Sequence, residues 1–167
     1  HQVMQRIADE VGETVNFAIP DSDGMIYLER IETDWPFRVQ LPVGTHVPFH
    51  CTASGKTFMA SLAPKVRTNM VGSLRLEKLT KNTLIDAENL LNELRLVAKQ
   101  GYAIDNEEFV DGMVAIAVPI KDEFGRYVAS LAFHGPLQRL SVEGATLRKD
   151  VLLNGAKTMK DILFTET

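Results

Sequence analysis

The sequence predicts an α+β domain in which a central antiparallel sheet is flanked by helices. Residues 15–31 and 113–135 each contain two runs of alternating apolar side chains around a tight turn, which is typical of a β-hairpin. Residues 86–101 carry an apolar stripe at helical spacing. Because strands joined by tight turns pair antiparallel, and a helix with one apolar stripe packs on a sheet face, these segments together indicate the α+β class.

The size and charge of the chain narrow its possible functions. Its 167 residues, of which 45% are hydrophobic and 24% charged, are typical of one globular domain with a sizeable core. The formal net charge is -4, whereas a domain that binds duplex DNA usually carries a basic patch. We therefore expect that these residues do not bind DNA by themselves.

The cysteine content and the apolar runs bear on the compartment. Cys51 is the single cysteine, so no internal disulfide can form, which fits a reducing cytoplasm. No apolar run approaches the roughly 18–20 residues that span a bilayer, and the polar first ten residues do not resemble a signal peptide. We expect a cytoplasmic protein with no membrane partner.

The N-terminal part is predicted to be a helix followed by a hairpin. Apolar side chains recur at helical spacing over residues 1–12, and Gly12 follows them as a stop. Alternation over residues 15–19 predicts a strand, the polar run 20–24 predicts a turn, and residues 25–31 form the returning strand.

The middle of the chain is predicted to change from irregular strand to helix. Residues 37–48 are interrupted by proline and glycine and predict an irregular strand. A helix is expected over residues 52–62, and Pro64 suits the first position of a short second helix. Asp86 suits the N-cap of the long amphipathic helix, and Gly101 suits its C-terminal stop.

The C-terminal part contains the clearest hairpin in the sequence. Strands are predicted over residues 113–121 and 127–135, around a turn at 122–125. Ser141 is expected to cap a last helix, whose apolar stripe runs to Leu163.

The two faces of this second hairpin differ, because side chains alternate along a strand. One face carries the larger apolar side chains Val114, Ile116, Val118, Ile120, Tyr127, Leu131 and Phe133, with Ala129. The other carries mostly small ones: Met113, Ala115, Ala117, Pro119, Val128, Ser130, Ala132 and His134. Small side chains either let a helix approach closely or leave a concavity. The polar His134 in line with Ala132 favours a pocket.

Residues 50–57 look like a phosphate-binding P-loop but lack its first glycine. His50 stands where that motif needs a glycine, five residues before Gly55, and its side chain would obstruct the loop. A simpler property remains at this helix start. Small residues such as Ala53 and Ser54 leave backbone N–H groups accessible, and such groups attract carboxylates. The alternative is that these residues are small only for packing.

Neither a metal site nor a nucleophile is predicted. Pro48 lies between His46 and His50 and argues against a helical pair of ligands, and no second cluster has ligand spacing. Cys51 stands beside His50, but no third group that would orient the histidine is evident. The acidic stretch 105–108 is expected by default to be a solvated turn.

Three stretches stand in a fixed order along the chain. They are Leu41-Pro42-Val43-Gly44 leading to His50 and Ala53-Ser54-Gly55-Lys56; Gly101-Tyr102-Ala103 with Asp105 and Glu107-Glu108; and Gly112 with Ala117-Val118-Pro119-Ile120, Gly125 and Gly135-Pro136. Taken together, their order and spacing resemble the effector-binding domain of the isocitrate-lyase-regulator (IclR) family of bacterial transcription regulators.

The resemblance implies a GAF-like fold whose cavity binds a small organic acid, the effector. It also implies a winged helix-turn-helix ahead of this chain, through which alone the protein would bind DNA, and a homodimer or homotetramer. Residues 1–12 would be the end of a linker helix, and residues 13–167 the effector-binding domain. No cofactor, metal or catalytic residue is implied.

The resemblance also assigns roles within the cavity. The backbone of Ala53 and Ser54 would hold the effector carboxylate, Met113 would form an apolar wall, and Asp105 matches a polar position. Three further residues fall where some members place thiols and hydroxyls: Ala115, Ala132 and His134.

These three residues suggest what the effector looks like. Alanines cannot hydrogen-bond through their side chains, so we expect an acid with a larger or more apolar body, including an aromatic one. A histidine ordinarily ionises near pH 6.5, so His134 would bind the carboxylate more strongly when protonated. Two alternatives remain: a stand-alone GAF-like sensor, and an enzyme that uses Cys51, His50 or His134 on a small acid.

Overall fold

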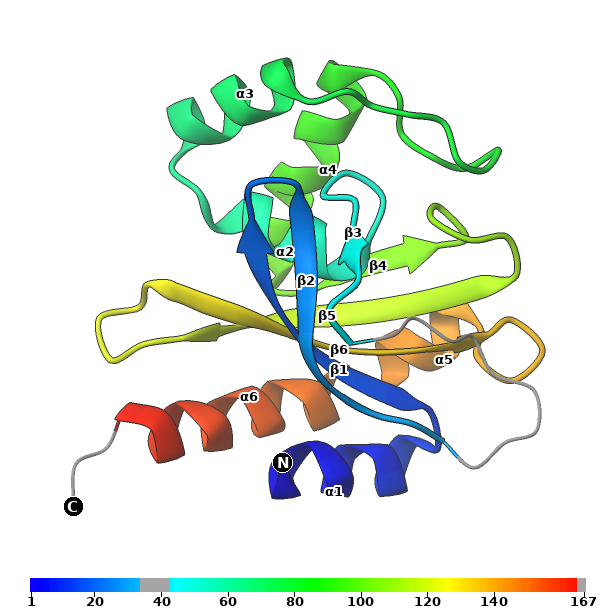
Figure 1. Ribbon diagram of the computed structural model, residues 1–167, viewed down its shortest axis with the longest axis vertical. Helices are drawn as coiled ribbons and strands as arrows, with labels where there is room; N and C mark the ends of the chain where they lie inside the picture. Colours follow the sequence, from blue (N-terminus) through cyan, green and yellow to red (C-terminus); the bar gives the residue numbers. More distant parts are fainter. Residues whose placement is uncertain (34–42, 165–167) are drawn as a thin grey trace.

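A computed structural model describes residues 1–33 and 43–164, which form one antiparallel sheet between two layers of helices (Figure 1). The sheet order is β3-β2-β1-β6-β5-β4. The strands are β1 Thr14–Asp21, β2 Gly24–Ile31, β3 His46–Val47, β4 Ala103–Asn106, β5 Met113–Lys121 and β6 Tyr127–Pro136. The helices are α1 Gln2–Val11, α2 Ala53–Ser61, α3 Pro64–Ser73, α4 Ala87–Gln100, α5 Val142–Leu147 and α6 Lys149–Phe164.

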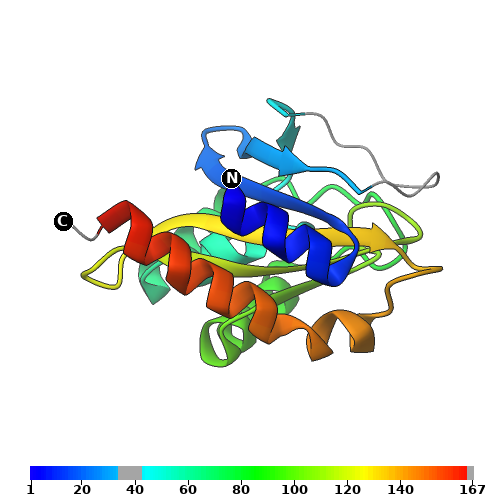
Figure 2. The same cartoon turned by 90° about the horizontal axis from the view of Figure 1, so that it is seen from below.

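One face of the sheet is covered by α1, α5 and α6 and holds the main core. Most of the large side chains of β5 and β6 pack there against both terminal helices. Tyr127 does not follow the predicted alternation: the register of β5 and β6 shifts between Ile120 and Lys121, and the Tyr127 ring lies on the other face, 5.3 Å from the ring of Phe58 in α2. Figure 2 shows α1 and α6 lying side by side across the strands. Gly155 permits this approach, because a Cβ at that position would come within 2.6 Å of the Ile7 side chain. The apolar stripe of α1 is therefore part of this domain's core.

The other face of the sheet is covered by α2 and α4. Here the small side chains of the hairpin meet the first turn of α2, in a buried cluster of Ala53, Ala115, Ala117 and Ala132. Gly55 serves a different contact, because a Cβ there would lie 2.3 Å from the backbone oxygen of Phe49, in the segment just before α2. The small residues thus let a helix approach the sheet closely.

Lys56 links α2 to α4 and to the end of β4 and the segment that follows it. Its side chain is fully buried, and Nζ donates to both carboxylate oxygens of Glu108, at 2.9 and 3.0 Å, and to the carbonyl of Ile104. Glu93 of α4 lies 3.5 Å away. Burial alone lowers the pKa of Lys56, but the charges of Glu108 and Glu93 outweigh it, and the pKa lies above its ordinary value. Lys56 is therefore a charged anchor between α2, α4 and the segment after β4.

Most predicted elements are confirmed, including both hairpins and the helices over 1–12, 52–62 and 86–101. The predicted irregular strand 37–48 lies partly outside the described residues; within it, His46–Val47 forms β3.

Three predictions differ from the structure. The last helix is two, α5 and α6, because the chain leaves helical geometry at Arg148, whose side chain bonds the carbonyl of Val11 at the end of α1. The strand β4 was not predicted. The solvated turn at 105–108 is wrong: Asp105 is only 1% exposed and Glu108 6%, because Lys56 draws this segment into the interior. No helix among the described residues is long and apolar enough to cross a membrane.

Candidate effector site

All seven residues predicted for the site line one small cavity between α2 and the sheet. They are Ala53 and Ser54 of α2, Asp105 of β4, Met113 and Ala115 of β5, and Ala132 and His134 of β6. About 10 Å³ of this cavity is open to a water-sized molecule, which is roughly the space of one water. The hairpin face therefore does both things that its small side chains allow: it admits the helix and leaves a concavity.

The register of the sheet brings these residues together. Asp105 pairs with Ala115, and Ala115 pairs with His134, so residues from three strands form one row on the face toward α2. The next row contains Ala132, which pairs with Asn16 of β1. The cavity lies over these two rows.

The first turn of α2 offers backbone donors to the cavity. Thr52 is the N-cap: its hydroxyl accepts the N–H of Gly55 at 3.1 Å, and its carbonyl accepts the N–H of Lys56 at 3.0 Å. The N–H groups of Ala53 and Ser54 come earlier in the turn and have no partner within the helix. The positive end of the helix dipole lies at the same place. This end of the cavity is therefore suited to an anion.

Asp105 is a buried acid with one unused oxygen. Its Oδ1 accepts the N–H of Glu108 at 2.7 Å, while Oδ2 has no hydrogen-bond partner among the described residues. Burial, followed by the negative charge of Glu108, raises the pKa of Asp105 to about 7. The carboxyl therefore changes between its neutral and charged forms near neutral pH.

Asn16 and His134 form the opposite polar wall. The Nδ2 of Asn16 lies 3.3 Å from Nδ1 of His134, and both side chains are buried. The Oδ1 of Asn16 has no partner within the described ranges. Two residues that line the cavity, Asn16 and Asp105, thus each carry a buried acceptor without a partner in the described part of the chain.

Four lining residues were missed by the sequence analysis: Asn16, Tyr27, Thr52 and Phe109. A signal existed for Asn16. It is a polar residue on the second face of a strand whose other face is apolar, but only the pairing of β1 with β6 shows that this second face lines the cavity.

The alternative chemistry at 46–51 finds no support in the geometry. Burial raises the pKa of the Cys51 thiol to about 12, so it stays protonated and is a poor nucleophile. His50 Nε2 lies 2.8 Å from the carbonyl of Glu77, and His46 pairs with Asp21 at 2.7 Å. Across residues 1–33 and 43–164, no group of three potential metal ligands comes together.

Comparison with known proteins identifies relatives across the whole domain. The family model "Bacterial transcriptional regulator IclR C-terminal" matches residues 1–159. SauR of Cupriavidus necator, described as a probable transcriptional regulator, is 37% identical over 143 residues, covering 86% of this chain and 57% of SauR. The regulator BhcR of Paracoccus denitrificans is 32% identical over 157 residues, covering 94% of this chain and 56% of BhcR. The chain thus spans a little over half the length of these relatives.

Solved structures agree with the sequence relatives. The Thermotoga maritima IclR structure superposes with a TM-score of 0.90 at 29% identity, over 98% of this chain and 66% of that one. The C-terminal domain of Escherichia coli KdgR superposes with a TM-score of 0.84 at 28% identity, over 95% of this chain and 92% of that one. The GAF-like α+β prediction is confirmed. The chain therefore belongs to the IclR family of bacterial transcriptional regulators and forms its C-terminal, effector-binding domain.

Proposed function

We propose that this domain senses a small carboxylate for a regulator whose DNA-binding part lies outside these 167 residues. The observation that carries the proposal is the small cavity in which the first turn of α2 lies near two buried acceptors, Asn16 Oδ1 and Asp105 Oδ2, that have no partner among the described residues. Its relatives include the transcriptional repressor AllR of Escherichia coli, 29% identical over 160 residues. The winged helix-turn-helix ahead of the chain, the homodimer or homotetramer, the cytoplasmic location and the linker role of residues 1–12 remain predictions.

We assign the two ends of the ligand to different groups. The carboxylate accepts the N–H groups of Ala53 and Ser54, where the helix dipole favours negative charge. A hydroxyl at the other end donates to Asn16 Oδ1 or Asp105 Oδ2, since each buried acceptor left unpaired costs about 1–3 kcal/mol.

The size of the cavity favours a short acid. Ala115 and Ala132 make the middle of the wall apolar, which supports an apolar ligand body. Room for about one water, however, means that any larger body has to push Met113 or Phe109 aside. A short hydroxy acid needs the least displacement. The aromatic effector expected from the sequence remains a prediction, and its binding would require the cavity to widen.

A thermal-shift screen tests the proposal. The panel contains short hydroxy acids, short oxo acids, aromatic acids and the uncharged amide of each. A ligand at a hundredfold excess over its Kd stabilises the folded state by about 2.7 kcal/mol, so a true effector raises the Tm clearly. We expect a hydroxy acid to raise it and its amide to leave it unchanged. Equal shifts with acid and amide, or no shift with any acid, would contradict the proposal.

The enzyme alternative is tested with the same acid. Incubation with stoichiometric protein, followed by recovery of the ligand, distinguishes the two: a sensor returns the acid unchanged, whereas an enzyme converts it. The domain's relatives are regulators, and we expect full recovery.

A further inference from the structure

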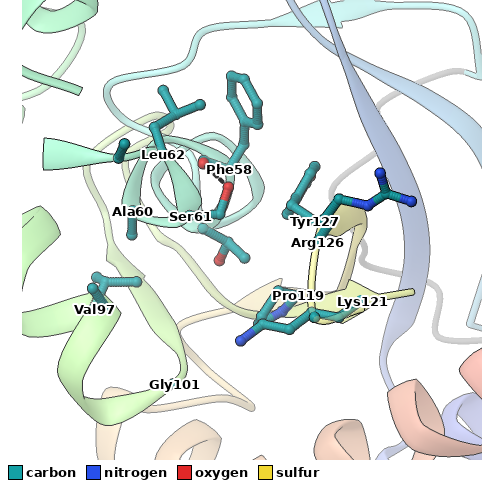
Figure 3. A pocket seen from close by; sticks show the side chains of 14 residues that line it. Phe58, Ala60, Ser61, Leu62, Val97, Gly101, Pro119, Lys121, Arg126 and Tyr127 are labelled. Carbon is teal, nitrogen blue, oxygen red and sulfur yellow. Dashed lines mark hydrogen bonds between the residues drawn. The ribbon is translucent and has the colours of Figure 1, made fainter. Parts of the chain in front are cut away.

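A second, larger cleft lies at the opposite end of α2 from the effector cavity (Figure 3). About 590 Å³ of it is open to water-sized molecules, within the range of about 300–1,000 Å³ that is typical of small-molecule sites. It does not share a lining residue with the effector cavity. Its walls come from three elements: the C-terminal half of α2, the end of α4, and the β5–β6 hairpin.

The walls of the cleft are largely apolar. Figure 3 shows Phe58 of α2 and Leu62, which follows α2, on one side and Val97 of α4 on another, with Pro119 and Tyr127 of the hairpin across from them. The Tyr127 hydroxyl is engaged, since it lies 2.6 Å from Ser130 Oγ. These surfaces suit a hydrocarbon body, because removing apolar surface from water is favourable.

Two polar features remain in this apolar surrounding. Lys121 lines the cleft and has no carboxylate within salt-bridge distance among the described residues, whereas the neighbouring Arg126 is held by Asp122 at 2.7 Å and points away. Thr57 lines the inner wall, and its buried hydroxyl lacks a partner in the described part of the chain. The cleft therefore offers one available cation beside an apolar surface.

We propose that this cleft is a second small-molecule site, which takes an amphipathic monocarboxylate. The hydrocarbon chain lies between α2 and α4, against Val97 and Pro119, and the carboxylate pairs with Lys121. The proposal does not depend on where the effector binds, because the two cavities have separate linings.

Octanoate is the probe, since an eight-carbon chain fits the cleft and greatly exceeds an effector cavity that holds about one water. Binding is followed by ¹H–¹⁵N correlation spectra of the domain. We expect saturable shifts at Val97, Gly101 and Lys121, and binding at least fivefold weaker for Lys121→Glu. The matched control is Lys157→Glu on the exposed side of α6, which should bind as the wild type does.

A second pair of variants tests whether octanoate occupies the cleft. Ala98 lines the cleft with an exposed side chain, so Ala98→Trp fills it without disturbing the core and should abolish binding. Ala87→Trp places the same ring at the exposed start of α4, away from the cleft, and should change nothing.

Three outcomes would overturn the proposal. One is the absence of saturation below the concentration at which octanoate forms micelles. Another is equal affinity for octanol, which lacks the charge that Lys121 would recognise. The third is a dependence of the same resonances on protein concentration without octanoate, which would show that a second copy of the chain covers the cleft.

Discussion

The two ends of α2 meet the same sheet face and yet enclose very different spaces. At the N-terminal end, alanines bring the helix so close to the sheet that only about 10 Å³ stays open, and polar groups surround it. At the C-terminal end, the rings of Phe58 and Tyr127, 5.3 Å apart, hold helix and hairpin apart, and about 590 Å³ stays open between apolar walls. Side-chain size along one helix thus decides which end can recognise a small polar ligand.

The two ends are also physically connected. The Tyr127 hydroxyl, at the cleft, bonds Ser130 Oγ, and Ser130 donates to the carbonyl of Ser54 at 2.9 Å, in the first turn of α2. Lys56 is fully buried and lies on the same helix, in sequence between the residues that line the two cavities. Both cavities therefore depend on the position of α2. A substitution that shifts this helix should affect both of them, whereas one at either end should affect the nearer cavity.

Removing the anchor should have the largest effect. Lys56→Met leaves the buried Glu108 carboxylate without its partner, and breaking a buried pair in this way costs about 3–5 kcal/mol. Arg126→Met breaks the pair with Asp122 at an arginine side chain that is 73% exposed, which should cost about 0–1 kcal/mol. Urea unfolding of both variants measures the difference. If the two losses were equal, Lys56 would not be the anchor of α2.

Removing the charge of Asp105 should stabilise the domain at neutral pH. Its pKa is raised, so between about pH 4 and pH 7 the folded state keeps a proton that the unfolded state has lost. Wild-type stability then falls as pH rises through this window, at about 1.4 kcal/mol per unit, and levels off above pH 7. The Asp105→Asn variant should not lose stability in this window. Its free energy of unfolding should therefore exceed that of the wild type by a few kcal/mol at pH 7.

The control for this prediction is Asp111→Asn, which changes an exposed acid in the same region. Unfolding free energies of the three proteins at pH 5, 6, 7 and 8 make the comparison. An advantage of Asp105→Asn that does not vary with pH would mean that Asp105 does not hold a proton in the folded state.

Blocking the N-terminal end of α2 should weaken acid binding. Ala53→Pro removes one backbone N–H, and the extended backbone of Thr52 (φ -110°, ψ 149°) is compatible with a following proline. A hydrogen bond to a charged group contributes about 1.5–3 kcal/mol, so affinity should fall at least tenfold. Ala87→Pro is the same change at the start of α4, where Asp86 has a similar backbone (φ -106°, ψ 127°). Calorimetric titration should find wild-type affinity in this control.

The pH dependence of acid binding should be the smallest effect. Above pH 7 the charged Asp105 repels a carboxylate ligand in the same cavity, so affinity should fall severalfold between pH 6 and pH 8. Asp105→Asn should abolish this dependence. A protonated His134 would give the same trend, so His134→Ala separates the two groups. Loss of the pH dependence in His134→Ala, with the dependence kept in Asp105→Asn, would mean that His134 senses the ligand charge.

Local patterns predicted the fold well, because alternation and turn residues act within a few positions. They predicted β5 and β6 nearly to the residue. The strand β4 was missed because it is four residues long and runs into an acidic segment, whose burial depends on Lys56, some fifty residues earlier in the chain.

The site could be predicted only in part from the sequence. The resemblance to a family indicated site residues in α2 and in the second hairpin, and these residues line one cavity. Asn16 was missed because its place in the cavity depends on β1 pairing with β6, a contact between distant segments. The volume of the cavity, and the whole of the larger cleft, depend on how closely α2 approaches the sheet, which no local pattern gives.

The central claim, that the effector carboxylate binds at the N-terminal end of α2, is tested most directly by backbone amide resonances. The acid selected by the thermal-shift screen is titrated into ¹⁵N-labelled domain. We predict that the amide protons of Ala53 and Ser54 move furthest and downfield, as expected for new hydrogen bonds to a carboxylate, while Val97 and Gly101 stay in place. The largest shifts at Val97 and Gly101, with Ala53 and Ser54 unmoved, would contradict the account.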